Sequence, residues 1–374
     1  MKFTINKNLL IENLQIVQKA MAVRSNMPAL TGIYTKVSDD KITLVTSNID
    51  LAIKVEIENK DFKIESTGEC LIPGKLFVDV VRKFNGDEVS LELVQDNVLR
   101  IVSGYSDVTM NLLEVQDYPQ QAFDLNNKPI VVNGKELKEI IRQTTFATAT
   151  LENKPILTGV NFRIYGNKLL AVSTDSFRLS RRVSILDDDY PETNIIIPAK
   201  SLNELSKTIV SDDDDVEIYL EKGKVLFCFD DIVFQSRLLE GNYPDTTKLI
   251  PTDFPIVIKF NKLELIESID RVSTMNSNAN TAAVVKLQIQ SNGSVVLTSS
   301  STELGTMTDM INPVDFPSMG EIKIAFSSLY IMDALKAFNG EEVYVKFISE
   351  IRQFIIESED DKGLVELVLP LKTE

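Results

Sequence analysis

One sequence pattern occurs three times in this chain of 374 residues. The segment LTGIYTKVSDDKITLVTSN at residues 30–48 returns 127 positions later as LTGVNFRIYGNKLLAVSTD at residues 157–175. A more diverged copy, VVKLQIQSNGSVVLTSS, occupies residues 284–300. Repetition on this scale determines the architecture, because each copy must fold as one unit and pack against its neighbours. The sequence therefore predicts three domains, which we place at residues 1–125, 126–250 and 251–374.

Each predicted domain contains two half-units in which an apolar strand and a polar turn precede a helix. Residues 3–14 are matched at 130–141 and 256–269, and residues 72–81 are matched at 197–205 and 325–335. Strands that alternate apolar and polar residues follow, as at Val160, Phe162 and Ile164. The pattern predicts an α+β fold. Helices are expected at residues 7–20, 75–84, 135–145, 200–209, 262–272 and 327–338.

Composition excludes several classes of enzyme. The chain has no histidine, which is the usual general base, the commonest metal ligand and a member of most nucleophilic triads. It also lacks the GxGxxG, GxxxxGK(S/T) and CxxC motifs. The acidic runs Asp187–Asp189 and Asp212–Asp215 are interpreted as solvated turns and not as metal sites, because no other ligand type lies nearby. An enzyme would have to use carboxylates or lysines alone, and no cofactor or metal is expected.

Cysteine usage and hydropathy bear on the cellular compartment. Cys70 and Cys228 both lie in apolar, strand-like runs, which favours buried free thiols over a disulfide or a metal site. No apolar run approaches the ~18 residues of a membrane span, and the charged start MKFTINKN lacks a signal-peptide core. These features predict a soluble, cytoplasmic protein.

The formal net charge of −16 is unevenly distributed. The six expected helices carry 13 Lys and Arg against nine Asp and Glu, a net charge of +4, which leaves −20 on the remainder. One interpretation is that these lysines form ordinary solvated helix faces. The other is that basic helices in an acidic body meet a polyanion such as nucleic acid.

Three repeats in a row leave sheet edges to be covered, because unpaired edges promote aggregation. Neighbouring repeats can pair edge to edge within the chain. Head-to-tail contact between two copies would cover the two outer edges and close a ring with two-fold symmetry. An open three-domain arc is the alternative.

The repeat and three further segments resemble a known family. These segments are TDSFRLS at residues 174–180, EGNYPDTTKLIP at 240–251 and LVLPLK at 367–372. In order and spacing they resemble the β sliding clamp of bacterial replication, the processivity factor of the replicative polymerase. The resemblance covers the chain from Phe3 to Lys372, and no single motif carries it.

The resemblance implies a non-catalytic, head-to-tail homodimer. Its six domains would encircle duplex DNA, with helices inside the ring and sheets outside. The tether would then be topological, so weak and sequence-independent phosphate contacts suffice. The implied partners are the replicative DNA polymerase, the clamp loader and repair polymerases, which bind through linear peptide motifs.

The resemblance places a peptide-binding pocket between the second and third domains. Its expected walls are Leu157, Thr174, Arg178, Leu179, Pro244, Leu249, Leu367, Leu369, Pro370 and Leu371, and its rim is Ser176, Phe177, Lys248, Gln353 and Lys372. Branched apolar side chains and prolines suit a preformed concavity, and Arg178 and Gln353 are expected to orient the ligand. Alternatively, Leu157, Leu179 and Leu369 are ordinary core residues. Family members often have histidine at the position of Phe177 and arginine at that of Lys248, so peptide preference is expected to differ here.

The same resemblance implies DNA contacts and a dimer interface. Arg24, Lys75, Arg82 and Lys200 match DNA-binding positions of the family. Leu76, Val80, Val108 and Met110 of the first domain would meet Thr274, Met275 and a strand near residues 298–303 of the third.

Two other functions compete with this interpretation. One is a scaffold with the same repeat and pocket that binds peptides without encircling DNA. The other is a carboxylate hydrolase that uses a pair such as Glu152 and Asp175. Against the hydrolase, the positions that correspond to Asp175 in the other repeats hold Asn48 and Ser300.

Overall fold

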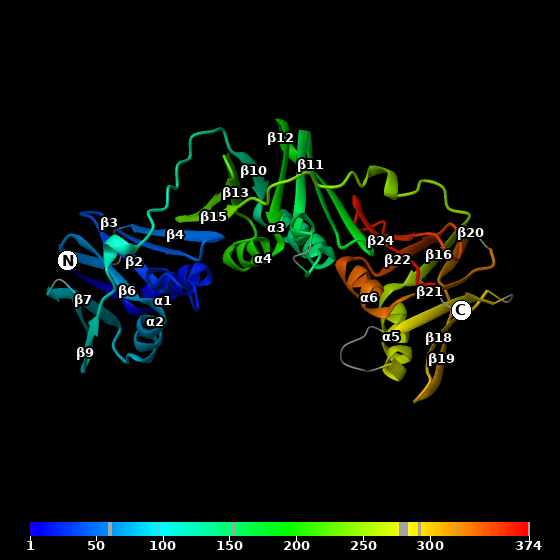
Figure 1. Cartoon of the computed structure of the whole chain (residues 1–374), viewed down its shortest axis with the longest axis horizontal. Helices are drawn as coiled ribbons and strands as arrows, with labels where there is room; N and C mark the ends of the chain where they lie inside the picture. The colour runs from blue at the N-terminus through cyan, green and yellow to red at the C-terminus, as the bar shows by residue number, and fades with distance from the viewer. Residues whose placement is uncertain are drawn as a thin grey trace. The chain divides into compact units, whose positions relative to one another are not determined.

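A computed structural model describes the chain except residues 59–61, 96, 152–153, 277–282, 291–292, 319 and 373–374. Its contacts divide the chain into two compact units (Figure 1). Unit 1 comprises Met1–Leu137 and Lys200–Leu238, and unit 2 comprises Lys138–Ala199 and Leu239–Glu374. The division falls inside the second repeat, because strands of this repeat join the sheets of both its neighbours.

Unit 1 contains a five-stranded and an eight-stranded antiparallel sheet. Its strands are β1 (Lys2–Asn6), β2 (Gly32–Val37), β3 (Lys41–Ser47), β4 (Leu51–Glu58), β5 (Phe62–Ser66), β6 (Gly68–Pro73), β7 (Glu88–Gln95), β8 (Val98–Ser103), β9 (Ser106–Asn111), β10 (Ile130–Asn133), β13 (Asp215–Glu221), β14 (Lys224–Phe229) and β15 (Ile232–Arg237). The sheets have the orders β5-β1-β7-β8-β9 and β10-β13-β14-β15-β4-β3-β2-β6. The β15·β4 pair, with Phe234 opposite Ile53, joins the first and second repeats edge to edge, as the repeat predicts.

The helices of unit 1 follow these strands directly. They are α1 (Lys7–Val17), α2 (Gly74–Lys83) and α4 (Ala199–Thr208), and α3 (Gly134–Thr144) begins here. Asn6 caps α1, because its side-chain oxygen accepts from the backbone N–H groups of Asn8 and Leu9. Helices α1 and α2 pack together and lie side by side (Figure 1). Lys19, just after α1, donates to the carbonyl of Lys207 on α4 at 2.5 Å, so the three helices form one layer.

Unit 2 contains a seven-stranded and a four-stranded sheet. Its strands are β11 (Gly159–Thr174), β12 (Arg178–Pro198), β16 (Ile256–Asn261), β17 (Val284–Ile289), β18 (Val295–Ser301), β19 (Gly305–Ile311), β20 (Asp315–Ser318), β21 (Lys323–Ser327), β22 (Glu342–Phe347), β23 (Phe354–Glu357) and β24 (Leu364–Val368). The orders are β11-β12-β24-β23-β22-β16-β20 and β19-β18-β17-β21. The β12·β24 pair joins the second and third repeats, as β15·β4 joins the first two.

The helices of unit 2 cover a large apolar core. They are α5 (Lys262–Ser273), α6 (Ser328–Ala337) and the greater part of α3. Phe260, Phe326, Phe347 and Phe354 are fully buried and lie in one cluster with Leu265 and Leu335 of α5 and α6. Short 3₁₀ turns complete the chain at η1 (Gln18–Ala20), η2 (Pro28–Thr31), η3 (Val115–Asp117), η4 (Thr145–Ala147), η5 (Pro155–Thr158), η6 (Thr247–Leu249) and η7 (Thr274–Asn276).

All six helices predicted from the sequence are found where they were expected, and the α+β class is confirmed. Two details differ. Asp187–Asp189 lies in strand β12 and not in a turn, although its side chains are exposed as expected. Both cysteines are free thiols, but only Cys70 is buried, whereas Cys228 is half-buried.

Within the part of the chain that the structure describes, no helix has the length and apolarity needed to cross a membrane.

Candidate functional site

The fifteen residues predicted to form a peptide site all lie in unit 2, and they separate into a buried and an exposed group. Leu157, Thr174, Leu179 and Leu367 are each at most 8% exposed. Phe177, Leu249, Leu369 and Leu371 are between 37% and 56% exposed. The first group therefore packs beneath the candidate site, and the second, together with the exposed Pro244, offers apolar surface to a ligand.

The buried group belongs to the core, as the alternative interpretation held for Leu157 and Leu179. Leu179 on β12 lies opposite Leu367 on β24, and both pack with Val172 and Ile355 in one cluster. Leu369, by contrast, lies beyond the end of β24 and is 38% exposed. The second and third repeats thus share a continuous apolar floor beneath the exposed leucines.

The loop between β11 and β12 is fixed by hydrogen bonds to its own backbone. Asp175 Oδ1 accepts from the N–H groups of Phe177 at 2.8 Å and Arg178 at 3.0 Å. The Thr174 hydroxyl donates to the Arg178 carbonyl at 2.6 Å. Ser176 has φ of 81°, a left-handed conformation that costs energy in a residue with a side chain. This tight loop presents the Phe177 ring outward.

Arg178 holds the loop in place through hydrogen bonds within the chain. Its guanidinium donates to Asp175 at 3.1 Å and to Asp333 at 2.6 Å. It also donates to the carbonyl of Phe146 at 2.7 Å. It lies over the rings of Phe146 and Tyr330, and its side chain is 11% exposed. Each nitrogen of the guanidinium is thus hydrogen-bonded within the chain, and the orientation of a ligand by Arg178 stays a prediction.

The C-terminal tail, residues 369–372, lies against the same loop. The N–H of Leu369 donates to the Phe177 carbonyl at 2.9 Å, and the N–H of Leu371 donates to the Ala325 carbonyl of β21 at 2.7 Å. Pro370 between them has no N–H to contribute. The Phe177 ring stacks on Tyr330 of α6 with 6.3 Å between centroids. The loop, the tail and α6 therefore form one exposed apolar surface.

The segment that contains Pro244, Lys248 and Leu249 completes this surface. Gln353 donates to the Leu249 carbonyl at 3.1 Å and so anchors this segment, while its second N–H and its amide oxygen leave capacity for a ligand. The Tyr243 hydroxyl accepts from the N–H of Thr174 at 3.0 Å, and burial raises the pKa of Tyr243 above its ordinary value. Sequence reasoning did not select Tyr243, Asp333 or Tyr330. For Tyr243 a signal existed, because its Tyr-Pro pair repeats one at Tyr118.

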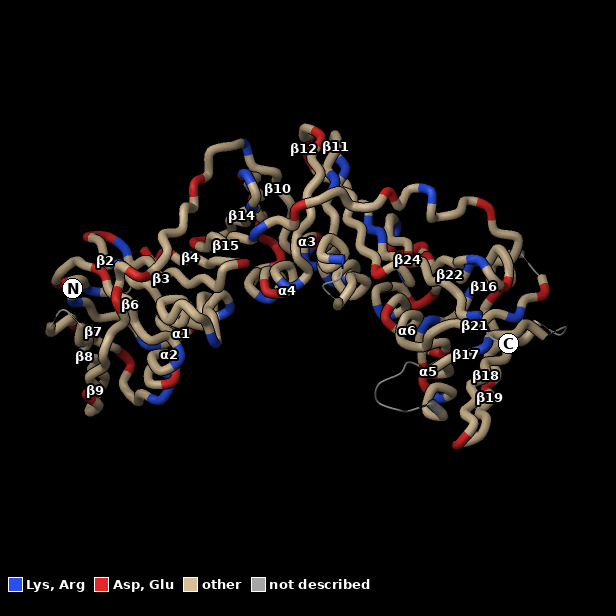
Figure 2. Tube along the Cα trace, in the orientation of Figure 1, with Lys and Arg blue, Asp and Glu red and all other residues tan. Residues whose placement is uncertain are grey.

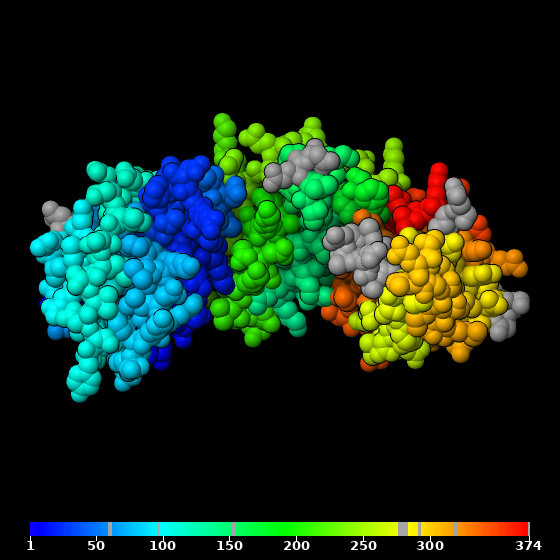
Figure 3. Space-filling model, turned by 60° about the horizontal axis from the view of Figure 1, so that its bottom comes forward, coloured from blue at the N-terminus to red at the C-terminus, as the bar shows by residue number. Residues whose placement is uncertain are grey.

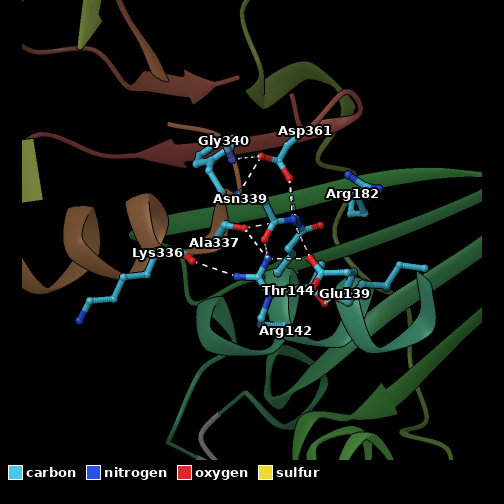
Figure 4. A network of polar contacts seen from close by, with 12 residues as sticks. Glu139, Arg142, Thr144, Arg182, Lys336, Ala337, Asn339, Gly340 and Asp361 are labelled. Carbon is cyan, nitrogen blue, oxygen red and sulfur yellow. Dashed lines mark hydrogen bonds and ion pairs between the residues drawn. The ribbon is translucent and has the colours of Figure 1, made fainter. Parts of the chain in front are cut away.

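A polar network joins the second and third repeats on the helix side of unit 2 (Figure 4). Arg142 of α3 donates to the carbonyls of Lys336 and Ala337 and to the side chains of Glu139 and Asn339. Asp361 accepts from the N–H groups of Asn339 and Gly340. Burial would raise the pKa of Glu139, but hydrogen bonds from Arg142 and Asn339 outweigh it and lower that pKa. Arg142 therefore connects the second and third repeats through hydrogen bonds and is not a free cation.

Glu366 is a buried carboxyl in the sheet beneath the site. It lies on β24, is 1% exposed, and has Ser180 Oγ at 2.8 Å from Oε1. Burial raises the pKa of Glu366 well above its ordinary value, although the hydrogen bond from Ser180 opposes the shift.

Comparisons with known proteins cover the whole chain. Models of the DNA polymerase III beta subunit match in order: the N-terminal domain at residues 1–123, the central domain at 131–245 and the C-terminal domain at 247–372. The chain belongs to the DNA polymerase III beta subunit family. A beta sliding clamp of Staphylococcus epidermidis is 37% identical over 378 residues, and one of Staphylococcus aureus is 35% identical, each with all of both chains covered. The crystal structure of the DNA polymerase sliding clamp from Bacillus subtilis matches with a TM-score of 0.95 and 37% identity over all of both chains.

The four family-derived DNA positions all lie in unit 1 and are exposed. They are Arg24, Lys75, Arg82 and Lys200. Among them only Arg82 has a hydrogen bond in the described structure, a long one of 3.5 Å to Gln18. Figure 2 shows basic residues on α1 and α2, and the space-filling view in Figure 3 shows the surface of this part of unit 1. These cations remain free to meet phosphates, whereas Arg142 and Arg271 are engaged within unit 2.

Two of the predicted dimer residues, Val108 and Met110, lie on β9 in unit 1, and the predicted strand near residues 298–303 of unit 2 adjoins β19. Both β9 and β19 are last in their sheets. Three of the family-derived residues suit such a contact: Leu76 is 54% exposed, and Val80 and Val108 are half-buried. Met110 is only 3% exposed and faces the core of its own unit. In unit 2, Thr274 is exposed. The side chain of Met275 lies beside Gly305 at the start of β19, with its Cε 3.8 Å from the point that a Cβ atom would occupy if residue 305 had one. The strand at residues 298–303 was a wrong choice of edge, because β18 pairs with both β17 and β19.

Proposed function

We propose that the chain is a DNA sliding clamp that closes as a head-to-tail homodimer around duplex DNA. In this role it tethers the replicative polymerase, the clamp loader and repair polymerases by their linear peptides and makes synthesis processive. It acts in the cytoplasm as a non-catalytic subunit. The observation that carries the proposal is the match of all three family domains in order along the chain.

The strand pairing supports ring closure. β15·β4 and β12·β24 cover the edges between repeats, which leaves β9 and β19 at the ends of their sheets. Met310 on β19 is 62% exposed, and Leu304 before it is also 62% exposed. Exposed apolar residues on an edge strand invite pairing with another strand. Joining β9 of one copy to β19 of another would satisfy both edges.

Retention on DNA tests the ring. The protein is loaded on nicked circular plasmid by its clamp loader and followed by gel filtration in moderate salt. We expect it to elute with the circle and to be lost once the plasmid is cut at one site, because the tether is topological. Binding that survives cutting would contradict encirclement, and a protein that binds partner peptides without ever being retained on circles would be a scaffold.

Calorimetric titration tests the peptide site. A peptide with a glutamine followed by leucine and phenylalanine anchors should bind the surface of Phe177, Leu249, Leu369 and Leu371. Leu369→Asp should weaken binding by roughly 2 kcal/mol or more, because truncated interface anchors commonly cost that much. Leu369 is exposed, so this variant should keep its melting temperature. A charge at the buried Leu179 would instead destabilise the apolar cluster beneath the surface. Leu263→Asp, on an exposed leucine of α5, is the matched control, and unchanged affinity of Leu369→Asp would place the site elsewhere.

A further inference from the structure

Unit 1 contains a cavity of about 720 Å³ that the proposed clamp function does not use. Its floor is the sheet of β2, β3, β4 and β6, and its other wall is the segment 112–123 that leads out of the first repeat. The N–H of Leu113 donates to the Leu71 carbonyl at 2.9 Å and holds this segment on the sheet. The volume falls in the range of sites that take small ligands or peptide side chains.

The cavity adjoins a set of supporting residues in the first repeat that corresponds to the supporting residues of the proposed peptide surface in the second. Val45 and Val172 are 127 residues apart, and each is paired across a hairpin with a basic residue, Lys54 or Arg181. Each valine also packs in a cluster with the tyrosine of a Tyr-Pro pair, Tyr118 or Tyr243. The same arrangement of a valine, a basic residue and a tyrosine therefore occurs in both repeats.

The two copies differ in the side chains that fill the framework. Where Leu179 faces Leu367 in unit 2, Ala52 faces Gln235 in unit 1. Two leucines pair in the sheet of unit 2, whereas a smaller residue and an amide pair at the corresponding position in unit 1. The cavity wall is correspondingly aromatic and polar: Tyr34 stacks on Tyr118 with 5.7 Å between centroids, and Lys54 lies over the Phe123 ring.

Two polar groups at the cavity have no partner among the described residues. The hydroxyl of Tyr118 is buried and has no hydrogen bond within the described structure, although its equivalent in Tyr243 is satisfied by the N–H of Thr174. Such a group costs free energy unless a water molecule or a ligand meets it. The ammonium of Lys36 is exposed at the cavity and has no ion pair with a described residue. Glu69 lies opposite Lys36 in the β2·β6 pair, but its Oε2 accepts from the Tyr34 hydroxyl, and Glu114 accepts from Asn97.

We propose that this cavity binds a peptide segment in which an aromatic side chain adjoins an acidic one. The aromatic ring enters between the segment 112–123 and the sheet and stacks against the Tyr34–Tyr118 pair. A backbone group of the peptide meets the Tyr118 hydroxyl, and the carboxylate pairs with Lys36. The proposal rests on the proposed function only for the idea that partners approach as linear peptides.

Tryptophan fluorescence of the peptide tests this, because the chain itself contains no tryptophan. The probe is acetyl-Glu-Trp-Leu-amide, titrated with the full-length chain, and acetyl-Lys-Trp-Leu-amide is the charge control. We expect a blue shift and raised anisotropy with the acidic probe at a dissociation constant below about 1 mM. Lys36→Glu should weaken binding by about five-fold or more, since even an exposed ion pair is worth that ratio at its upper end. Lys222→Glu, the same charge change on an exposed turn of unit 1, should leave it unchanged.

Two further variants assign the binding to this cavity. Tyr118→Phe keeps the ring and removes the hydroxyl, so it should weaken the acidic probe without lowering the melting temperature. Leu369→Asp disables the other surface and should leave the probe bound. Loss of probe binding in Leu369→Asp, equal effects of Lys36→Glu and Lys222→Glu, or no spectral change at all would each overturn the proposal. Calorimetry with the glutamine-leucine-phenylalanine peptide reports separately on the proposed clamp site, so the two can fail independently.

Discussion

At the scale of single residues, Glu366 should make the stability of the chain depend on pH. Its pKa in the folded chain is raised by burial, so the folded state holds a proton that the unfolded state releases above the ordinary glutamate pKa of about 4.3. The contribution of Glu366 to the free energy of unfolding is therefore fully present below that pH. It is lost as pH rises toward the pKa of the folded state, by up to about 1.4 kcal/mol per pH unit. Glu366→Gln should flatten this dependence and raise the melting temperature at pH 8 more than at pH 5.

The measurement is a series of melting curves between pH 5 and pH 8. Glu357→Gln provides the control, because Glu357 lies on the neighbouring strand β23 but is paired with Lys346 near the surface. A wild-type chain whose stability is constant over this range, or a variant with an unaltered slope, would show that Glu366 is ionised in the folded state.

At the scale of elements, the edges β9 and β19 should hold the dimer, and exposed residues beside them are the right places to test it. Met110 is unsuitable, because its side chain lies in the core and a charge there would unfold the unit. Leu76→Glu on α2 places a charge on a side chain that is 54% exposed. We expect monomers of 41.9 kDa by light scattering, with the melting curve of a folded chain. Val210→Glu, on another exposed apolar residue, should remain dimeric, and a dimeric Leu76→Glu would remove this helix from the interface.

The sequence predicted the elements well because each is determined by local spacing. Apolar residues at helical spacing after a short polar turn located all six helices, and the 127-residue repeat located the strands around Val45 and Val172. What the sequence could not give was the direction of individual side chains. Arg178 looks like a ligand contact in its motif, but two carboxylates and a carbonyl that surround it come from distant segments or from its own loop. Likewise, Val108 and Met110 lie two residues apart on the same face of β9, and only the packing of the sheet shows that Met110 is buried whereas Val108 is half-buried.

The pairing of repeats was predictable, but the identity of the free edge was not. The resemblance selected the polar segment at residues 298–303 as a dimer strand, yet β19 lies outside β18 because a hairpin continues the sheet by one strand. β24 stops at Val368, two residues before Pro370, which has no N–H to donate to a strand ladder. The exposed part of the peptide surface could therefore be anticipated, whereas its buried supports, such as Tyr243 and Asp333, required the fold.

At the scale of the whole molecule, an acidic chain can serve DNA if its attachment is topological and its interactions with phosphates are weak. The chain carries a net charge of −16, while Arg24, Lys75, Arg82 and Lys200 are exposed in unit 1. A tight electrostatic interface would slow movement along the duplex, and repulsion from the acidic remainder discourages binding elsewhere. Retention and affinity should therefore respond differently when these four cations are removed.

We expect the quadruple alanine variant at Arg24, Lys75, Arg82 and Lys200 to separate the two properties. Direct binding to a short duplex should weaken, and the slope of log affinity against log salt should become shallower by about 0.9 for each phosphate that is no longer neutralised. Retention on a closed circular plasmid should persist once the protein is loaded, because ring closure uses other residues. The control replaces Lys36, Lys63, Lys222 and Lys224, four cations of unit 1 outside the proposed DNA positions, and should leave the slope unchanged. If the first variant also escaped from closed circles while remaining dimeric, the ion pairs with phosphate would themselves be the tether, and encirclement would not explain how this chain stays on DNA.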